Sequence, residues 1–375
     1  MPTFIPTNAK SIMLKRNYAD GWFLEKYAMN IYRGCQHACE YCDGRSQRYY
    51  LDLDIANKIY IKVNAPELVK KGLKNKEKGI VAVGGGIGDS YQPIEKKYEL
   101  TRKVLEVLRE LEFPAFILTK SSLVERDLDL LKEINEQSLA LVAFTITSLD
   151  DDVWKTWEPR ASPPKERFKT IGKFSRAGVP TGVVMMPLLP FISDSIDSIE
   201  PLVSRAKEEG VTFILAAGLT LRDRQKEYYY QKLKEKHPDL IPKYDQIYSE
   251  SGYSQNREYV EKLNSTVLQV CRKYEMPLRI PHKLFHGKIG IKDEISHVLS
   301  QIGYLLDLMG KRGSAYRKAA NQVFKTTEDV TKLSEEGRIT EIPGVGEKIG
   351  KVIDEIIQTG KSEHYLKLIK LERNQ

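Results

Sequence analysis

Short apolar runs alternate with amphipathic stretches through the middle of the chain. Runs that end at glycine or at a polar turn predict strands at 80–86, 113–121, 139–148, 179–190 and 211–219. The stretches between them repeat apolar residues at helical spacing and predict helices over 93–111, 124–137 and 163–178. A further strand at 29–34 makes about six βα units, fewer than the eight of a closed barrel. We therefore expect an α/β fold built on an open, partial (β/α)6 barrel.

Polar residues collect where these strands end, at 84–89, 119–121, 145–148 and 185–187. The carboxyl ends of parallel strands meet at one edge of a sheet, and that edge carries the chemistry of such folds. The pattern predicts a functional site there.

The last 85 residues contain only helical patterns separated by turn residues. This change predicts two domains, residues 1–290 forming the partial barrel and residues 291–375 a small all-α domain. Removal of the second domain is expected to leave the chemistry of the first intact.

Composition narrows the setting. The chain has 375 residues, 41% of them apolar, and a formal net charge of +8. No apolar run approaches the roughly 18 residues of a membrane span, and the first residues lack the order of a signal peptide. Four cysteines, three of them clustered, argue against a disulfide framework. We expect a cytoplasmic protein without membrane contact, for which a polyanion is a compatible partner.

Three of the four cysteines, Cys35, Cys39 and Cys42, stand at C-x3-C-x2-C spacing. Three thiolates on a [4Fe-4S] cluster leave one iron open, which S-adenosylmethionine can chelate through its amino and carboxylate groups. Zinc bound by the same cysteines with His37, or unrelated buried thiols, are the alternatives. The spacing favours the cluster, because His37 lies inside the loop and would strain it as a zinc ligand.

The segments 33–46, 88–102, 118–131 and 144–168 resemble successive signatures of the radical S-adenosylmethionine superfamily, in the branch that contains spore photoproduct lyase. The resemblance spans roughly residues 25 to 285. It implies that the three cysteines ligate a [4Fe-4S] cluster, and that a 5′-deoxyadenosyl radical is formed with an electron from a donor such as ferredoxin or flavodoxin. The cosubstrate-binding residues that it implies are Gly84, Gly85, Asp89, Ser90, Tyr91, Lys120, Ser148, Arg160 and Met185. For Arg160, a local salt bridge with Glu158 is the alternative.

The sequence departs from the lyase at one position. The cysteine that donates a hydrogen atom in that family aligns near Gly86, where this chain has no thiol. Tyr91 and Cys271 are the catalytic candidates that could replace it, and the cosubstrate itself is the third possible hydrogen donor. A cysteine within a helix is most often a buried core residue.

The carboxy-terminal segments 315–323 and 342–361 resemble the amino-terminal lyase domain of family X DNA polymerases, a helix-hairpin-helix fold. Val352 occupies the position of that family's Schiff-base lysine, so the resemblance implies DNA binding without lyase chemistry. Residues 291–375 hold 14 lysines and arginines against 13 acidic residues, so local groups rather than overall charge must contact phosphates. The candidate contacts are the hairpin residues Gly344, Val345, Gly346 and Lys348 with the cluster Lys311, Arg312, Tyr316, Arg317 and Lys318. A protein-protein docking module is the alternative.

These observations predict a radical enzyme that acts on nucleic acid, with lyase-like repair of DNA photoproducts as its expected reaction. One alternative is a glycosylase-like or nuclease-like repair protein with a structural cluster, which would need Cys271 as its fourth ligand. A radical enzyme that modifies RNA or protein is the other.

Overall fold

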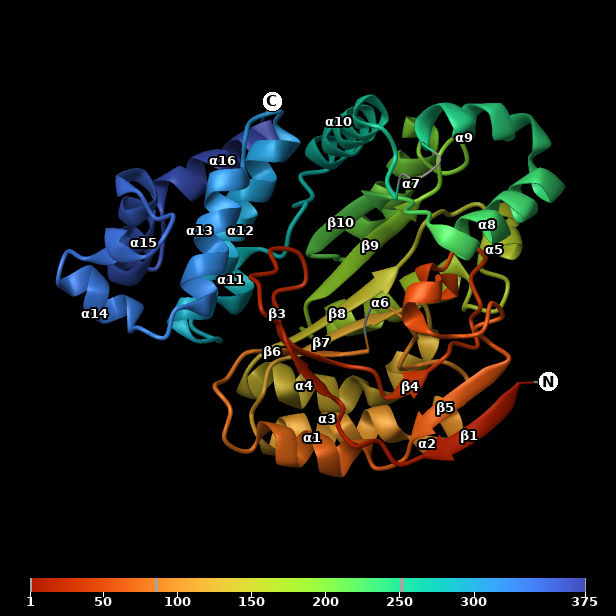
Figure 1. The fold of residues 1–375 in the computed structure, drawn as a ribbon, viewed down its shortest axis with the longest axis horizontal. Helices are drawn as coiled ribbons and strands as arrows, with labels where there is room; N and C mark the ends of the chain where they lie inside the picture. Colours follow the sequence, from red (N-terminus) through yellow and green to blue (C-terminus); the bar gives the residue numbers. More distant parts are fainter. Residues whose placement is uncertain (1, 85–86, 250–252, 375) are drawn as a thin grey trace.

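The computed structural model describes residues 2–84, 87–249 and 253–374. Its centre is a curved seven-stranded sheet in the order β10-β9-β8-β7-β6-β3-β2. All neighbours pair in parallel except β2 and β3. Six parallel strands in an open sheet confirm the expected partial barrel (Figure 1).

The strands and helices have the following bounds. The large sheet contains β2 (Met13–Lys15), β3 (Glu25–Met29), β6 (Ile80–Val83), β7 (Ala115–Thr119), β8 (Ala140–Thr145), β9 (Thr181–Leu188) and β10 (Phe213–Gly218), and a small sheet contains β1 (Thr3–Thr7), β4 (Tyr32–Arg33) and β5 (Lys58–Lys62). The helices before residue 290 are α1 (Ala65–Leu73), α2 (Glu95–Tyr98), α3 (Leu100–Glu110), α4 (Leu128–Gln137), α5 (Asp151–Trp157), α6 (Pro164–Arg176), α7 (Ile196–Glu208), α8 (Asp223–Lys236), α9 (Ile241–Ile247), α10 (Arg257–Lys273) and α11 (His282–Phe285). The carboxy-terminal helices are α12 (Ile291–Leu308), α13 (Ser314–Lys325), α14 (Val330–Glu335), α15 (Glu347–Thr359) and α16 (Glu363–Asn374).

The first barrel strand differs from the expectation. Residues 25–29 form the parallel strand β3 beside β6, whereas Tyr32–Arg33 pair with β5 in the small sheet. The strand at 29–34 was therefore placed a few residues too late. All five residues of β3 are buried, including Glu25 and Lys26, and these charged residues hide the apolar pattern of a strand.

Alternate residues of each strand enter two different hydrophobic clusters. Val81, Ile117 and Val142 belong to the cluster that also contains residues of α1, α3, α4, α6, α7 and α10. Their neighbours Ala82 and Leu141 belong to a second cluster. Successive side chains of a strand point to opposite faces, so the helices of the βα units cover one face only.

The second cluster joins the inner face of the sheet to the carboxy-terminal helices. It contains Phe116 and Val184 of the sheet together with Ile295 and Leu299 of α12 and residues of α13 to α16. Figure 1 shows α12 and α13 beside the sheet, with the segment that precedes β3 between them. The two regions therefore share one core.

Residues 19–24 form the bridge between these regions. The Trp22 ring meets Tyr304 of α12 at 5.8 Å, and Phe23 meets Phe116 of β7 at 5.5 Å. Removal of residues 291–375 would expose this shared apolar surface to water, at a free-energy cost of about 25 cal/mol for each Å² exposed. The expectation that such a truncation leaves the barrel chemistry intact is therefore not supported by the packing.

In the parts of the chain described here, no helix has the length and apolar character needed to cross a membrane.

Candidate cluster and cosubstrate site

The cysteine loop begins directly after β4 and is held by backbone contacts. Gly34 adopts a φ of +92°, and a side chain there would lie 2.4 Å from the Lys58 carbonyl oxygen. The Cys35 amide donates to the Ile55 carbonyl at 2.8 Å. The position thus requires glycine, because only glycine combines the left-handed conformation with so close a backbone approach.

A buried arginine fixes the rest of the loop. The Arg45 guanidinium donates to the carbonyl oxygens of Ala38 at 2.9 Å, Cys39 at 3.3 Å and Leu53 at 2.7 Å. These bonds satisfy carbonyls that a tight loop leaves without helix or sheet partners. The three thiols are consequently presented by a rigid backbone.

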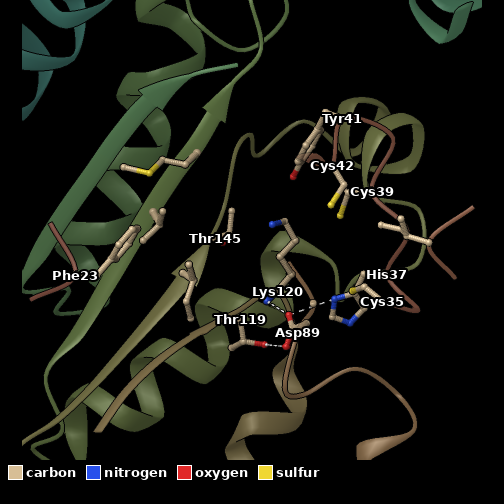
Figure 2. A pocket seen from close by; sticks show the side chains of 15 residues that line it. Phe23, Cys35, His37, Cys39, Tyr41, Cys42, Asp89, Thr119, Lys120 and Thr145 are labelled. Atoms are coloured by element: carbon tan, nitrogen blue, oxygen red, sulfur yellow. Dashed lines mark hydrogen bonds and ion pairs between the residues drawn. The ribbon is translucent and has the colours of Figure 1, made fainter. Parts of the chain in front are cut away.

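All three cysteines of the loop line one cavity of about 260 Å³. Cys35, Cys39 and Cys42 carry free thiols. Figure 2 shows the Cys39 and Cys42 sulfur atoms pointing in the same direction, with Cys35 beside the His37 ring. The remaining wall is formed by side chains from the inner face and the strand ends, among them Phe23, Ile55, Asp89, Leu118, Thr119, Lys120, Thr145, Val184 and Met186.

Asp89 links the cysteine loop to two strand ends. Its carboxylate accepts from the Thr119 hydroxyl at 2.7 Å and from the Lys120 amide at 2.8 Å, and lies 3.3 Å from His37 Nδ1. Burial alone would raise the pKa of Asp89, but the His37 imidazolium and the backbone amides that donate to this carboxylate hold the pKa at about 2. Burial likewise disfavours the charged form of His37, yet Asp89 and Cys35 raise its pKa to about 10. The His37 ring therefore interacts with Asp89 and Cys35 at the edge of the same cavity.

A second buried network lies beneath the cysteines. Glu158 accepts hydrogen bonds from Arg167 at 2.5 Å and from the Tyr41 hydroxyl. Arg167 also donates to the Thr145 carbonyl at 2.7 Å. Burial would raise the pKa of the Glu158 carboxyl, but Arg167 and Lys120 hold it below its usual value. An ionised carboxylate thus anchors Tyr41, which stands between two of the cysteines.

The donor set suits a metal centre. Burial raises the pKa of Cys39 and of Cys42 above that of a free thiol. Buried thiolates need a positive partner, which a bound metal centre provides and which Lys120 beside the Tyr41 ring reinforces. The residues present therefore fit a cluster bound through three cysteines.

Of the predicted cosubstrate residues, Asp89 and Lys120 line the cavity. Figure 2 shows Lys120 extending into the cavity near Thr145. Gly84 instead lines a second cavity. Its φ is +79°, and a side chain there would collide with the Ser90 hydroxyl at 2.0 Å. Gly85, and Gly86 where the missing thiol aligns, lie outside the described residues.

Other predicted residues support the site from behind. Ser90 donates to the Val83 carbonyl at 3.1 Å, and the Ser148 hydroxyl accepts from the Asp150 amide at 3.0 Å. Neither residue is among those that line the cavity. Both stabilise the turns that follow their strands.

The structure places two predicted cofactor residues away from the cavity. Met185 packs into the outer cluster, and its neighbour Met186 lines the cavity instead. A slip of one residue reverses the face of a strand, which explains this correction. Arg160 is exposed and lines a separate pocket with Tyr228, and Glu158 pairs with Arg167 rather than with Arg160.

The two catalytic candidates also lie in the core. Tyr91 is fully buried, and its hydroxyl donates to Asp127 at 3.1 Å. Cys271 is buried in the outer cluster on α10. Neither residue lines the cavity, so this placement does not support their assignment as hydrogen donors. A cluster closed by Cys271 as fourth ligand is likewise unsupported.

Four cavity residues were not singled out from the sequence. Thr119, Thr145 and Met186 lie in the strand-end segments where the site was expected, whereas Phe23 lies outside all of them. The alternation of β9 could have identified Met186, since Val184 and Met186 share a face. No local pattern could have identified Phe23, because it precedes the first barrel strand.

A second cavity of about 290 Å³ adjoins the first and shares Phe23 and Leu118 with it. Its wall combines aromatic and charged side chains, namely Tyr18, Trp22, Phe116, Arg16, Asp20 and Glu25. Burial and the nearby Asp20 raise the pKa of Glu25 to about 7, despite its pairing with Arg16. This chamber offers both stacking surfaces and hydrogen-bonding groups.

The carboxy-terminal hairpin connects α14 to α15. Gly344 has a φ of +82°, and Gly346 is the N-cap of α15, where no side chain caps the first amides. The Val345 amide, however, donates to the Ile342 carbonyl at 3.0 Å. Val345 therefore closes the turn rather than offering its amide to a phosphate, which corrects its predicted role.

The basic candidates surround this hairpin unevenly. The Lys318 side chain lies close to Gly344, about 3.7 Å from where a side chain on that glycine would begin, and Lys348 is exposed on α15. Lys311 and Arg312 are exposed in the turn after α12. Arg317 pairs with Asp307, and the Tyr316 ring stacks on His364 at 5.5 Å. Lys318 and Lys348 are thus the cations best placed to accompany the hairpin.

Comparison with known proteins matches two families. Residues 29–206 match the Radical SAM superfamily, and residues 291–362 match a helix-hairpin-helix domain. An uncharacterized protein of Mycobacterium tuberculosis is 30% identical over 257 residues, which are 67% of this chain and 75% of that protein. A radical SAM Nalpha-GlyT isomerase of Pseudomonas phage M6 is 24% identical, covering 68% of this chain and 52% of the isomerase.

Spore photoproduct lyase in complex with dinucleoside spore photoproduct shares the fold. The match has a TM-score of 0.56 at 16% identity and covers 72% of this chain and 79% of the lyase. A lyase mutant with bound AdoMet and the same dinucleoside has a TM-score of 0.54 at 15% identity over the same shares. The radical SAM superfamily uses a [4Fe-4S] cluster with S-adenosylmethionine. By its matching segments, its fold and its three-cysteine cavity, this chain belongs to that superfamily.

Proposed function

We propose that this protein is a radical SAM enzyme that acts on a damaged or modified base in nucleic acid, with lyase-like repair of a DNA photoproduct as its reaction. One observation carries the proposal. The helix-hairpin-helix region packs on the inner face of the sheet through residues 19–24, and Phe23 of this segment lines both cavities. None of the described residues after 290 lines either cavity, so the helix-hairpin-helix region reaches the reaction chamber through this segment rather than with its own side chains.

The cavity residues would have different roles. Cys35, Cys39 and Cys42 would hold the cluster, and Asp89 and Lys120 would contact the polar groups of the cosubstrate. When bound, the cluster and cosubstrate supply a 5′-deoxyadenosyl radical that abstracts a hydrogen atom. Leu118 and Val184 add apolar walls that limit the access of water.

The second cavity suits the substrate. A reacting carbon must come within about 3 to 3.5 Å of its partner, so a base must leave the stacked duplex to react. Tyr18 and Trp22 offer surfaces for stacking, and Arg16 and Glu25 can form hydrogen bonds with the edge of a base. A lesion that already disturbs stacking reduces the energy needed for extrusion.

A base rearrangement is a second candidate. Apart from the three cluster cysteines, none of the described residues that line the cavity carries a thiol. A rearrangement needs no protein donor, because the abstracted hydrogen can return to the product from the cosubstrate. The phage relative named as an isomerase favours this reading.

The test is a lesion assay with labelled substrates. Reconstituted, reduced protein is incubated with DNA containing spore photoproduct, cyclobutane dimers and 6-4 products, and each lesion is quantified by mass spectrometry. We expect one lesion to decline and deuterium to move from the substrate into 5′-deoxyadenosine.

Parallel incubations with transfer RNA and with a peptide pool separate the alternatives. The Cys39→Ala variant serves as the inactive control. Label transfer only from RNA or peptide would overturn the DNA assignment. A product isomeric with its substrate, formed with return of the label, would favour the rearrangement.

A further inference from the structure

A group of metal-binding side chains lies where the barrel meets the carboxy-terminal helices, outside the cluster cavity. His282 is the first residue of the short helix α11, His286 is its C-cap, and Glu294 lies in the first turn of α12. Their ligand atoms all lie within 4.8 Å of one another. Figure 1 shows α11 next to α12, on the side of the molecule that faces the helix-hairpin-helix region.

Both imidazoles converge on the same carboxylate oxygen. His282 Nε2 and His286 Nδ1 each lie 2.7 Å from Glu294 Oε1. Around a tetrahedral zinc ion with bonds near 2.0 Å, neighbouring ligand atoms are about 3.3 Å apart. The two nitrogen–oxygen distances are slightly shorter than this. Small side-chain rotations would therefore make room for the ion, which would replace the hydrogen-bonding protons between the imidazoles and the carboxylate.

The surroundings orient the three ligands. Glu294 Oε2 accepts the Gly287 amide at 3.0 Å, which directs Oε1 toward the imidazoles. The His282 ring packs against Phe285 at 5.1 Å, and a side chain on Gly360 would lie 2.6 Å from the His286 ring. Such supporting contacts are typical of metal sites, where they hold each ligand in one rotamer.

The three ligand side chains differ in how far they are exposed to solvent. The Glu294 side chain is 2% exposed, His282 13% and His286 52%. A buried carboxylate is disfavoured without a compensating charge, and a divalent ion provides one. The exposed side of His286 leaves room for water as a fourth ligand.

We propose that His282, His286 and Glu294 bind a divalent transition-metal ion with the borderline character of zinc. Two imidazoles and one carboxylate suit zinc, and they disfavour magnesium and calcium, which prefer oxygen ligands. The ion joins the last helix before residue 290 to the first helix after it. It therefore fastens the helix-hairpin-helix region to the barrel, and it does so independently of the substrate.

The test uses the full-length chain with Cys35, Cys39 and Cys42 all changed to alanine, so that cluster thiols cannot bind zinc. The protein is loaded with zinc chloride alone, desalted and analysed for metal. We expect one zinc per chain, which is lost in His286→Ala and in Glu294→Gln and retained in the matched control His364→Ala. Loading with cobalt chloride should give the visible absorption of a four-coordinate site.

Two further measurements keep the result interpretable. In the reconstituted holoenzyme, added zinc should bind while the iron content stays constant. A chelator should lower the thermal midpoint of the zinc-loaded chain and leave that of His286→Ala unchanged. The proposal would be overturned by a zinc content near background in the cysteine-free chain, or by equal zinc in that chain with and without His286→Ala. Either result would show that His282, His286 and Glu294 form hydrogen bonds without binding a metal. S-adenosylmethionine cleavage is assayed separately, so this outcome is distinguishable from a failure of the proposed function.

Discussion

The cluster cavity and the carboxy-terminal hairpin present different groups to their expected ligands, side chains in the cavity and backbone amides at the hairpin. The cavity is formed by buried and half-buried side chains from the cysteine loop, the segment before β3 and the ends of several strands. The hairpin is exposed, spans only a few consecutive residues, and offers backbone amides at the start of α15. The first site depends on charges compensated inside the protein, whereas the second depends on access to the backbone. Side-chain changes should therefore dominate in the cavity, and changes that block close approach should dominate at the hairpin.

The largest effect is expected from removal of one cluster cysteine. Cys39→Ala should abolish S-adenosylmethionine cleavage, because two thiolates cannot hold a cluster in the geometry that leaves one iron open. Iron content and 5′-deoxyadenosine release measure this. Cys271→Ala is the matched control, since Cys271 lies in the outer core. Equal losses in both variants would contradict the three-cysteine assignment.

The second comparison contrasts two arginines close in sequence. Arg167→Ala removes the arginine that pairs with the buried carboxylate of Glu158, which costs about 3 to 5 kcal/mol of unfolding free energy. Arg160→Ala removes an exposed group and should change stability by about 0.5 kcal/mol or less. Urea unfolding of both variants, with iron content as a second readout, tests this. A large effect of Arg160→Ala with none from Arg167→Ala would contradict the pairing of Glu158 with Arg167.

The buried region should also be the source of a pH dependence. The pKa of Glu25 rises from 4.5 to about 7 on folding, because burial and Asp20 outweigh the pairing with Arg16. The folded state then binds more protons than the unfolded state between these values, so stability falls as pH rises through this window, by roughly 3 kcal/mol in total.

Glu25→Gln should therefore flatten the decline of the thermal midpoint between about pH 4.5 and pH 7. Glu110→Gln, an exposed carboxylate on α3, is the control. Identical slopes in all three proteins would show that Glu25 does not titrate in this window.

The smallest effect belongs to the hairpin. Gly346 has an ordinary φ of −91° and open space around it, so Gly346→Val should fold normally and only block close approach of a phosphate. DNA affinity should fall several-fold, about 1 kcal/mol, with S-adenosylmethionine cleavage unchanged. Fluorescence anisotropy at two salt concentrations measures it. Gly290→Val, at the N-cap of α12 with equally open space, is the matched control.

The sequence predicted the strands from residue 80 onward better than it predicted the first strand of the barrel. The apolar runs of β6 to β10 and the three cysteines are local patterns, and each lies where it was expected. The first strand was misplaced because β3 buries two charged residues, Glu25 and Lys26. Lys26 tolerates burial through ion pairs with Glu77 and Asp293, both far away in the chain. No pattern within β3 reveals these partners.

What the sequence determined by itself was the chemistry of the donors: three thiols at fixed spacing, glycines at the hairpin, and apolar runs that must form a buried parallel sheet. The tertiary structure decided which of two neighbouring methionines faces the cavity, which arginine pairs with Glu158, and that Phe23 completes the wall. The physical reason is the range of the interactions. Turn geometry and hydrophobic periodicity act over a few residues, whereas the compensation of buried charges and the closing of a cavity join residues that only the folded chain brings into contact.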